Sequence, residues 1–186
     1  QVQHSTNPIP RLFIPTVRKV ILIIPRSMLR DITMRLLAIN VILGFLSGCL
    51  SLPQNVVPVD GFELNRYLGT WYEIARLDHS FERGLDKVTA EYFLRDDGGV
   101  GVINKGFSAA ENKWKEAEGK AYFVRDSQQG YLKVSFFGPF YGAYIIFELD
   151  KVDYQYAFVT SYDKSYLWLL ARTPMVNEEL ITRFVQ

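Results

Sequence analysis

Apolar and polar residues alternate over most of the chain after residue 60, in short runs separated by turn residues. A period of two places successive side chains on opposite faces of a β-strand. The runs are rich in Val, Ile, Tyr and Phe, which favour strands. They predict eight strands, near residues 69–77, 88–95, 100–107, 117–124, 131–137, 143–149, 156–162 and 166–172.

Short links join the predicted strands. Residues 96–99, 126–130 and 163–164 each begin with Asp and are typical of hairpin turns. Because parallel neighbours need a crossover of about a dozen residues or more, we expect antiparallel pairs. Eight antiparallel strands can close as an up-and-down barrel or fold as a sandwich, and the pattern alone leaves both open. An eight-stranded barrel holds either packed side chains or one small ligand.

Alternation also predicts which side chains face the interior. They are Val88, Ala90, Tyr92, Leu94, Ala121, Phe123, Leu132, Val134, Phe136, Tyr166, Trp168 and Leu170. At the ends of the domain, the sequence predicts a helical turn at 63–67 and a helix after Arg172. Pro174 suits the first position of that helix, and the acidic residues 178–179 suit its positive end.

The N-terminal part has a different pattern. Residues 34–48 begin with Met34 and Arg35, continue with about eleven mostly apolar residues and end in small residues, which is the order of a signal peptide. The apolar stretch is shorter than the roughly twenty residues that a membrane-spanning helix needs. Residues 1–33 contain four prolines and no sustained period, so we interpret them as upstream sequence or an artificial extension.

Composition fits one globular domain, since the 186 residues are 48% hydrophobic and 15% aromatic with a net charge of +1. The charge is uneven: residues 1–48 carry +5 and the remainder −4. The remainder also holds 25 of the 27 aromatic residues, which can fill a core or line a cavity. A mildly acidic domain without basic runs argues against nucleic acid as a partner.

Few residues suit metal, cofactor or catalytic chemistry. Cys49 is the only cysteine, which excludes an intrachain disulfide and a multi-cysteine metal site, and two histidines argue against a histidine zinc site. No phosphate loop, dinucleotide fingerprint or Gly-x-Ser-x-Gly motif occurs, and 106–110 is only a near match to the last. The adjacent residues Asp78, His79 and Ser80 do not suit a catalytic triad, whose geometry is tertiary. We therefore expect no cofactor, no metal and no enzyme.

Residues 46–49, Leu-Ser-Gly-Cys, resemble the bacterial lipobox. The resemblance implies cleavage before Cys49 and attachment of lipid to its thiol; the alternative is a buried structural cysteine. Several acyl chains would hold the protein firmly, because each buried methylene adds about 0.8 kcal/mol. Leu50, in place of Asp, favours the outer membrane by analogy with lipoprotein sorting. Residues 49–59 would then form a lipidated tether.

Residues 60–76 contain Gly69-Thr70-Trp71 and resemble the first signature of the lipocalin family. Residues 160–163 match the second signature loosely, and 169–174 resemble the third. Four further segments, 81–85, 104–106, 118–121 and 134–142, resemble bacterial outer-membrane lipocalins. The resemblance therefore covers residues 60–186.

The resemblance implies an all-β fold, an eight-stranded antiparallel up-and-down barrel open at one end, with a C-terminal helix. Gly69 and Trp71 would lie at the closed end, with Arg172 across the indole, a contact worth about 0.5–2 kcal/mol. Lipocalins continue past the helix into a ninth strand. Because the sequence stops about ten residues into that helix, truncation is expected.

The resemblance also implies a carrier of hydrophobic ligand, a fatty acid or lysophospholipid, anchored in the bacterial outer membrane and facing the periplasm. The expected wall residues are Tyr92, Ala121, Phe123, Val134, Phe136, Tyr141 and Trp168. Both the alternation and the family resemblance predict that Trp168 faces the cavity. Arg76 and Arg83, near the expected mouth, would either pair with a charged head group or form solvated surface.

Two other functions stay open. The protein could be a lipid-anchored structural or interaction module with a vestigial cavity. It could also be a lipocalin-type enzyme on a lipid-like substrate, which requires polar groups inside the barrel, such as Glu73 or Glu148. An apolar mouth would equally suit membrane contact or a homodimer.

Overall fold

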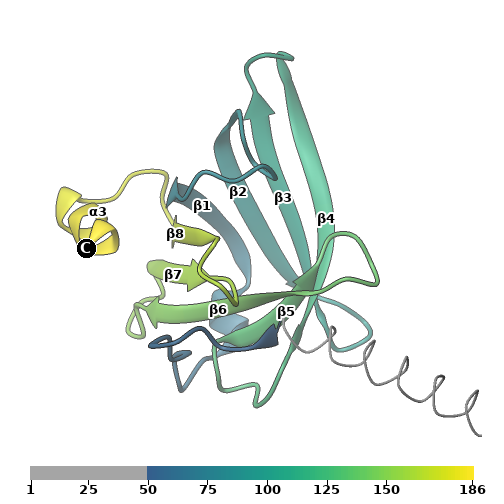
Figure 1. Ribbon diagram of the computed structural model, residues 1–186, viewed down its shortest axis with the longest axis vertical. Coiled ribbons are helices and arrows are strands. Elements are labelled where there is room, and N and C mark those ends of the chain that lie inside the picture. Colours follow the sequence, from purple (N-terminus) through teal and green to yellow (C-terminus); the bar gives the residue numbers. More distant parts are fainter. Residues whose placement is uncertain (1–49) are drawn as a thin grey trace, which may run out of the picture. The chain divides into compact units, whose positions relative to one another are not determined.

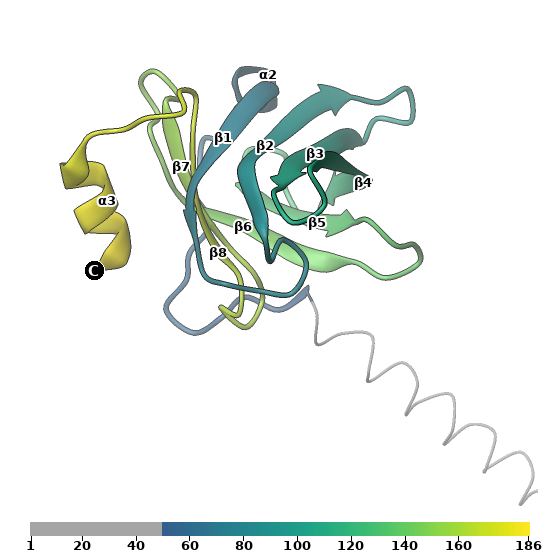
Figure 2. The ribbon, with the colours of Figure 1, turned by 90° about the horizontal axis from the view of Figure 1, so that it is seen from above.

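A computed structural model describes residues 50–186, which form a closed barrel of eight antiparallel strands (Figure 1). Each strand pairs with the next along the chain, and the last pairs with the first. The strands are β1 (Gly69–Arg76), β2 (Leu85–Leu94), β3 (Val100–Ser108), β4 (Lys113–Phe123), β5 (Tyr131–Ser135), β6 (Gly142–Leu149), β7 (Tyr156–Thr160) and β8 (Leu167–Ala171). The barrel is therefore confirmed over the sandwich, and Figure 2 shows the strands as a ring.

Strands β3 and β4 form the longest hairpin, which extends past the rest of the barrel (Figure 1). Strand β4 begins at Lys113, four residues before the predicted start. Three of the four additional residues, Lys113, Lys115 and Glu116, are charged and lie on both faces, so apolar alternation could not identify this part of the strand. Leu94, predicted to face inward, is 56% exposed, because it ends β2 beyond the buried part of the barrel.

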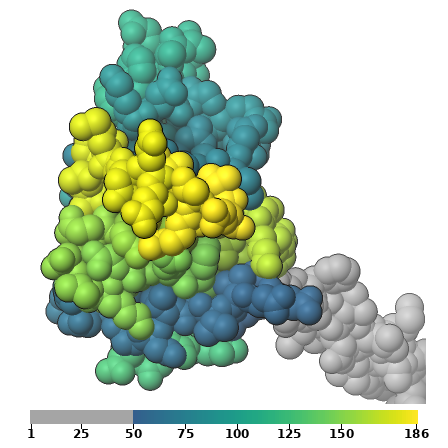
Figure 3. All heavy atoms as spheres, turned by 90° about the vertical axis from the view of Figure 1, so that its left-hand side faces the viewer, coloured from purple at the N-terminus to yellow at the C-terminus, as the bar shows by residue number. Residues whose placement is uncertain are grey.

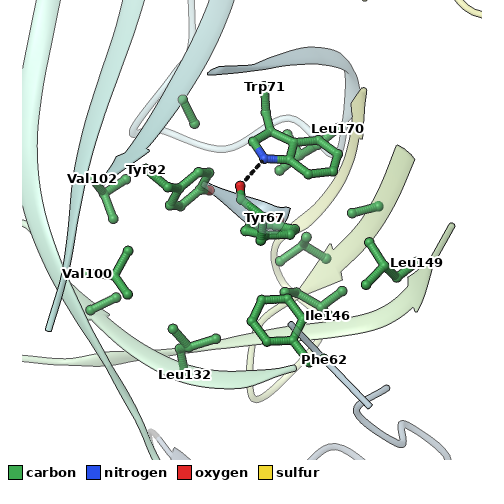
Figure 4. Close-up of a cluster of buried hydrophobic side chains, with 14 of the residues drawn as sticks. Phe62, Tyr67, Trp71, Tyr92, Val100, Val102, Leu132, Ile146, Leu149 and Leu170 are labelled. Carbon is green, nitrogen blue, oxygen red and sulfur yellow. Dashed lines mark hydrogen bonds between the residues drawn. The ribbon is translucent and has the colours of Figure 1, made fainter. Parts of the chain in front are cut away.

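One end of the barrel is closed by α2 (Leu64–Tyr67) and by the buried Trp71 (Figure 4). The indole N–H of Trp71 donates to the carbonyl oxygen of Tyr67 at 2.7 Å. The Arg172 guanidinium lies 4.0 Å from the indole centroid and donates to three backbone carbonyls, those of Arg66, Leu68 and Thr70. Arg172 thus ties α2 to β1 and β8.

Gly69 lies at the start of β1 in this closed end. Its φ of +92° falls in the region that L-residues with a side chain rarely adopt. A Cβ at this position would make only an ordinary van der Waals contact, 3.6 Å from the Arg172 guanidinium, so the backbone angle alone sets the constraint. The backbone turn into β1 therefore requires glycine.

Helix α3 (Glu178–Val185) lies on the outside of the barrel (Figure 3). Its N-cap is Asn177, whose side-chain oxygen accepts from the Leu180 N–H at 2.9 Å, so the prediction of Pro174 as the first helical residue was wrong. Arg183 pairs with Glu148 at 2.6 Å, which places Glu148 on the outer surface and not in the interior. Within residues 50–186, no helix has the length and apolar content of a membrane span. The predicted segments 1–33 and 34–48, and Cys49, lie outside the described residues.

Candidate functional site

The barrel encloses a cavity of about 380 Å³. The middle of its wall is made of small and medium apolar side chains, Val88, Ala90, Val100, Val102, Ala121 and Leu132, from four strands. The cavity reaches the end of the barrel that carries the β1–β2, β5–β6 and β7–β8 loops, which contribute Phe81, Phe140 and Tyr162. A concave, mainly apolar site of this size is typical of small-molecule binding.

The structure brings together most of the residues that the sequence predicted as wall positions. The lining contains Tyr92, Ala121, Val134, Phe136, Tyr141 and Trp168. Phe123, the seventh, lies outside the lining and packs in the core, with its ring 6.1 Å from that of Phe62. Alternation places Phe123 on the inner face correctly, but β4 ends there, next to the packed closed end.

Three tyrosine hydroxyls meet deep in the cavity. The Tyr144 hydroxyl lies 2.8 Å from that of Tyr67 and 2.7 Å from that of Tyr92. Burial raises the pKa of all three phenols, so they stay protonated and uncharged. Sequence reasoning missed Tyr67 and Tyr144; for Tyr144, alternation along β6 was the available signal.

Two glutamates line the part of the cavity nearer the mouth. Glu73 belongs to β1 and Glu82 to the β1–β2 loop, and their side chains are only 6% and 5% exposed. Arg76 donates to the Glu73 carboxylate and to the backbone carbonyls of Glu82 and Leu85. The indole N–H of Trp168 donates to Glu82 Oε2 at 3.1 Å. These contacts fix the β1–β2 loop against β1 and β8.

Glu73, Arg76, His79 and Glu82 form a cluster whose charges are unbalanced. Burial, followed by the negative charge of Glu82, raises the pKa of Glu73 to about 7. His79 lies with Nε2 3.1 Å from Glu82 Oε2, but burial, with the charge of Arg76, lowers its pKa and favours the neutral ring. Within the described residues of this cluster, Arg76 is thus the one group that stays cationic, facing two carboxylates.

The two arginines predicted near the mouth have different surroundings. Arg76 is committed to partners inside the protein, as described above. Arg83 pairs with Asp78 at 2.9 Å, and both side chains are well exposed. Neither arginine lines the cavity.

Two exposed aromatic rings lie on one side of the mouth. Phe137 and Phe140 of the β5–β6 loop are 71% and 76% exposed and also line the cavity. Phe81, on the opposite loop, lies with its ring 5.3 Å from that of Phe136. Among residues 50–186, no group of three or more His, Cys, Asp or Glu is placed to hold a metal ion.

Comparisons with known proteins agree with this geometry. The model of the lipocalin-like domain matches residues 62–186. The chain is 62% identical over 141 residues to outer membrane lipoprotein Blc of Vibrio cholerae, covering 76% of this chain and 82% of the relative. It is 56% identical over 128 residues to the protein of that name from Escherichia coli K12, with coverages of 69% and 72%.

Solved structures support the fold alone. Insecticyanin from the tobacco hornworm Manduca sexta aligns with a TM-score of 0.58 at 22% identity, over 73% of this chain and 78% of that chain.

Proposed function

This chain belongs to the lipocalin family and is a bacterial outer-membrane lipoprotein, and on that basis we propose that it binds and carries a fatty acid or lysophospholipid. The cavity is the observation that carries this proposal. It is apolar along its middle, polar at two defined places and continuous with a mouth that carries the exposed rings of Phe137 and Phe140. Such a shape suits an amphiphile with one acyl chain.

The driving force would be burial of the acyl chain. Each methylene removed from water contributes about 0.8 kcal/mol, so ten methylenes would supply roughly 8 kcal/mol before the costs of ordering the ligand. The interior polar groups largely pair with one another, as the tyrosine hydroxyls and the Glu82–Trp168 bond illustrate. This arrangement favours binding over catalysis.

Trp168 provides the first test. The full chain should bind a fluorescent fatty acid at micromolar or lower concentration, and lysophospholipid should displace it. Trp168→Ala should weaken binding about tenfold, because it removes wall area and the hydrogen bond to Glu82. Trp114→Ala, on the exposed outer face of β4, is the matched control and should bind normally.

Saturable binding that only Trp168→Ala weakens would support the carrier. A folded wild-type chain that binds neither lipid at high micromolar concentration would contradict it and favour an anchored interaction module with a vestigial cavity.

We also propose that Cys49 carries the lipid anchor. In a Gram-negative host, labelled palmitate should enter the wild-type chain, which should fractionate with the outer membrane. Cys49→Ser should take up no label. Equal labelling of both proteins would show that Cys49 is not the acylated residue.

A further inference from the structure

We propose that the mouth of the cavity selects amphiphiles whose head group carries an ammonium ion, through the carboxylates of Glu73 and Glu82. This inference rests on the proposed carrier function and ranks its ligands by head group, with an ammonium ion above an uncharged group and a fatty-acid carboxylate last. The two carboxylates line the cavity between its apolar middle and its aromatic mouth. An acyl chain inserted towards the tyrosine hydroxyls would therefore leave its head group beside the two carboxylates.

The charge balance favours a cation at this position. Arg76 is held by one carboxylate and two backbone carbonyls, so it cannot turn towards an anionic head group without breaking these bonds. With His79 neutral, two carboxyl groups face one guanidinium, so the cluster has an excess of negative charge above about pH 7, where Glu73 loses its proton. An ammonium ion would neutralise it, and a carboxylate would add to it.

The neighbouring groups are aromatic faces and a hydrogen-bond acceptor. Trp168 and Tyr166 both line the cavity, with rings stacked at 5.4 Å and an interplanar angle of 18°. Aromatic faces attract cations. Asn104, on the inner face of β3, lines the cavity with a buried Oδ1 that has no hydrogen-bond partner. An ammonium group brings several N–H donors to such a site.

The pKa of Glu73 also favours a bound cation. Its pKa of about 7 shows that a second negative charge here is costly, and a bound cation would remove that cost. The groups facing Glu73 are Arg76 on its own strand and Glu82 and His79 on the loop. Lys105 and Lys115 border a smaller adjoining cavity that also includes Glu82, and they pair with Glu116 and Glu111 respectively. As pH falls from 8 to 6, Glu73 gains a proton, so affinity for a cation should fall.

The experiment uses the full chain and three probes with one dodecyl chain, namely dodecylammonium, dodecanoate and dodecanol. Each displaces a fluorescent fatty acid at pH 8 and pH 6. At pH 8 we expect dodecylammonium to bind about tenfold more tightly than dodecanol, and dodecanoate to bind most weakly. Lysophosphatidylethanolamine should likewise exceed lysophosphatidylglycerol of the same acyl chain. The ammonium preference should decrease at pH 6.

Variants assign the effect to the two carboxylates. Glu82→Gln and Glu73→Gln should each reduce the ratio of ammonium to alcohol affinity towards one, and Glu73→Gln should also remove its pH dependence. Glu91→Gln, on the exposed outer face of β2, is the control and should keep both. If one variant does not fold, the other and the wild-type pH series still decide.

The outcomes separate the two proposals. Equal binding of the three probes, or tightest binding of dodecanoate, would overturn the selection of ammonium and leave the carrier function intact. A preference that survives in both glutamine variants would overturn the assignment to these carboxylates. Absence of binding by every probe would overturn the carrier function and this inference together.

Discussion

Replacing Trp71 by alanine is expected to lower the free energy of unfolding by about 3–5 kcal/mol, the usual cost of deleting a large buried aromatic side chain. Trp71 is fully buried at the closed end. The centroid of its ring lies 4.6 Å from that of Tyr67, and the Arg172 guanidinium lies over the indole. The substitution would leave a void and remove the contact that orients Arg172. Urea unfolding followed by circular dichroism measures the change.

Trp114→Ala is the control for this experiment, since it removes the same side chain from a position that is 59% exposed. Substitutions at such surface positions usually change stability by about 0.5 kcal/mol or less. A Trp71→Ala variant no less stable than Trp114→Ala would show that the closed end does not depend on the buried indole.

Local sequence pattern predicted the strands well because each strand of an antiparallel barrel pairs with its neighbour along the chain. Closure requires contact between β1 and β8, which no local pattern encodes. Closure was predicted here from the resemblance of Gly69-Thr70-Trp71 and of the segment with Arg172 to lipocalin signatures. The structure explains them physically, because Arg172 bonds to carbonyls that lie about a hundred residues earlier in the chain.

The polar part of the site was harder to predict. Glu73 was one of two candidates for an inward carboxylate, and period-two alternation from Trp71 places it inward. The same alternation from Tyr144 along β6 would place Glu148 inward as well, but the register shifts between Ile146 and Glu148, and Glu148 faces outward. Glu82, however, lies in a loop, where no periodicity applies. Its burial depends on Trp168 and His79, contacts that exist only in the folded chain. Phe123 illustrates a different limit of the prediction. Alternation correctly places its side chain on the inner face, but it does not show how far the cavity extends along the strand.

The size of the side chains explains where the cavity lies. Ala90, Val100, Val102 and Ala121 leave space in the middle of the barrel, and tyrosine and tryptophan side chains fill the closed end. The same alternation therefore produces a packed core at one end and a cavity beside it. Replacing one of these small residues by a large one should fill the cavity without unfolding the barrel.

Ala121→Trp makes this test, because Ala121 is 3% exposed, faces inward from β4 and lies between Val100 and Val134 in the cavity wall. An indole there would displace about five methylenes of acyl chain, each worth about 0.8 kcal/mol, so affinity should fall roughly a thousandfold.

The same fluorescent fatty-acid titration measures this loss of affinity. Overpacking should cost only about 1–3 kcal/mol of stability, so the variant should keep its β-sheet circular dichroism. Glu118→Trp, exposed on the outer face of the same strand, should bind as the wild type does. Unchanged affinity in a folded Ala121→Trp variant would mean that the ligand occupies a site outside the barrel, because two bulky groups cannot share the middle of this cavity.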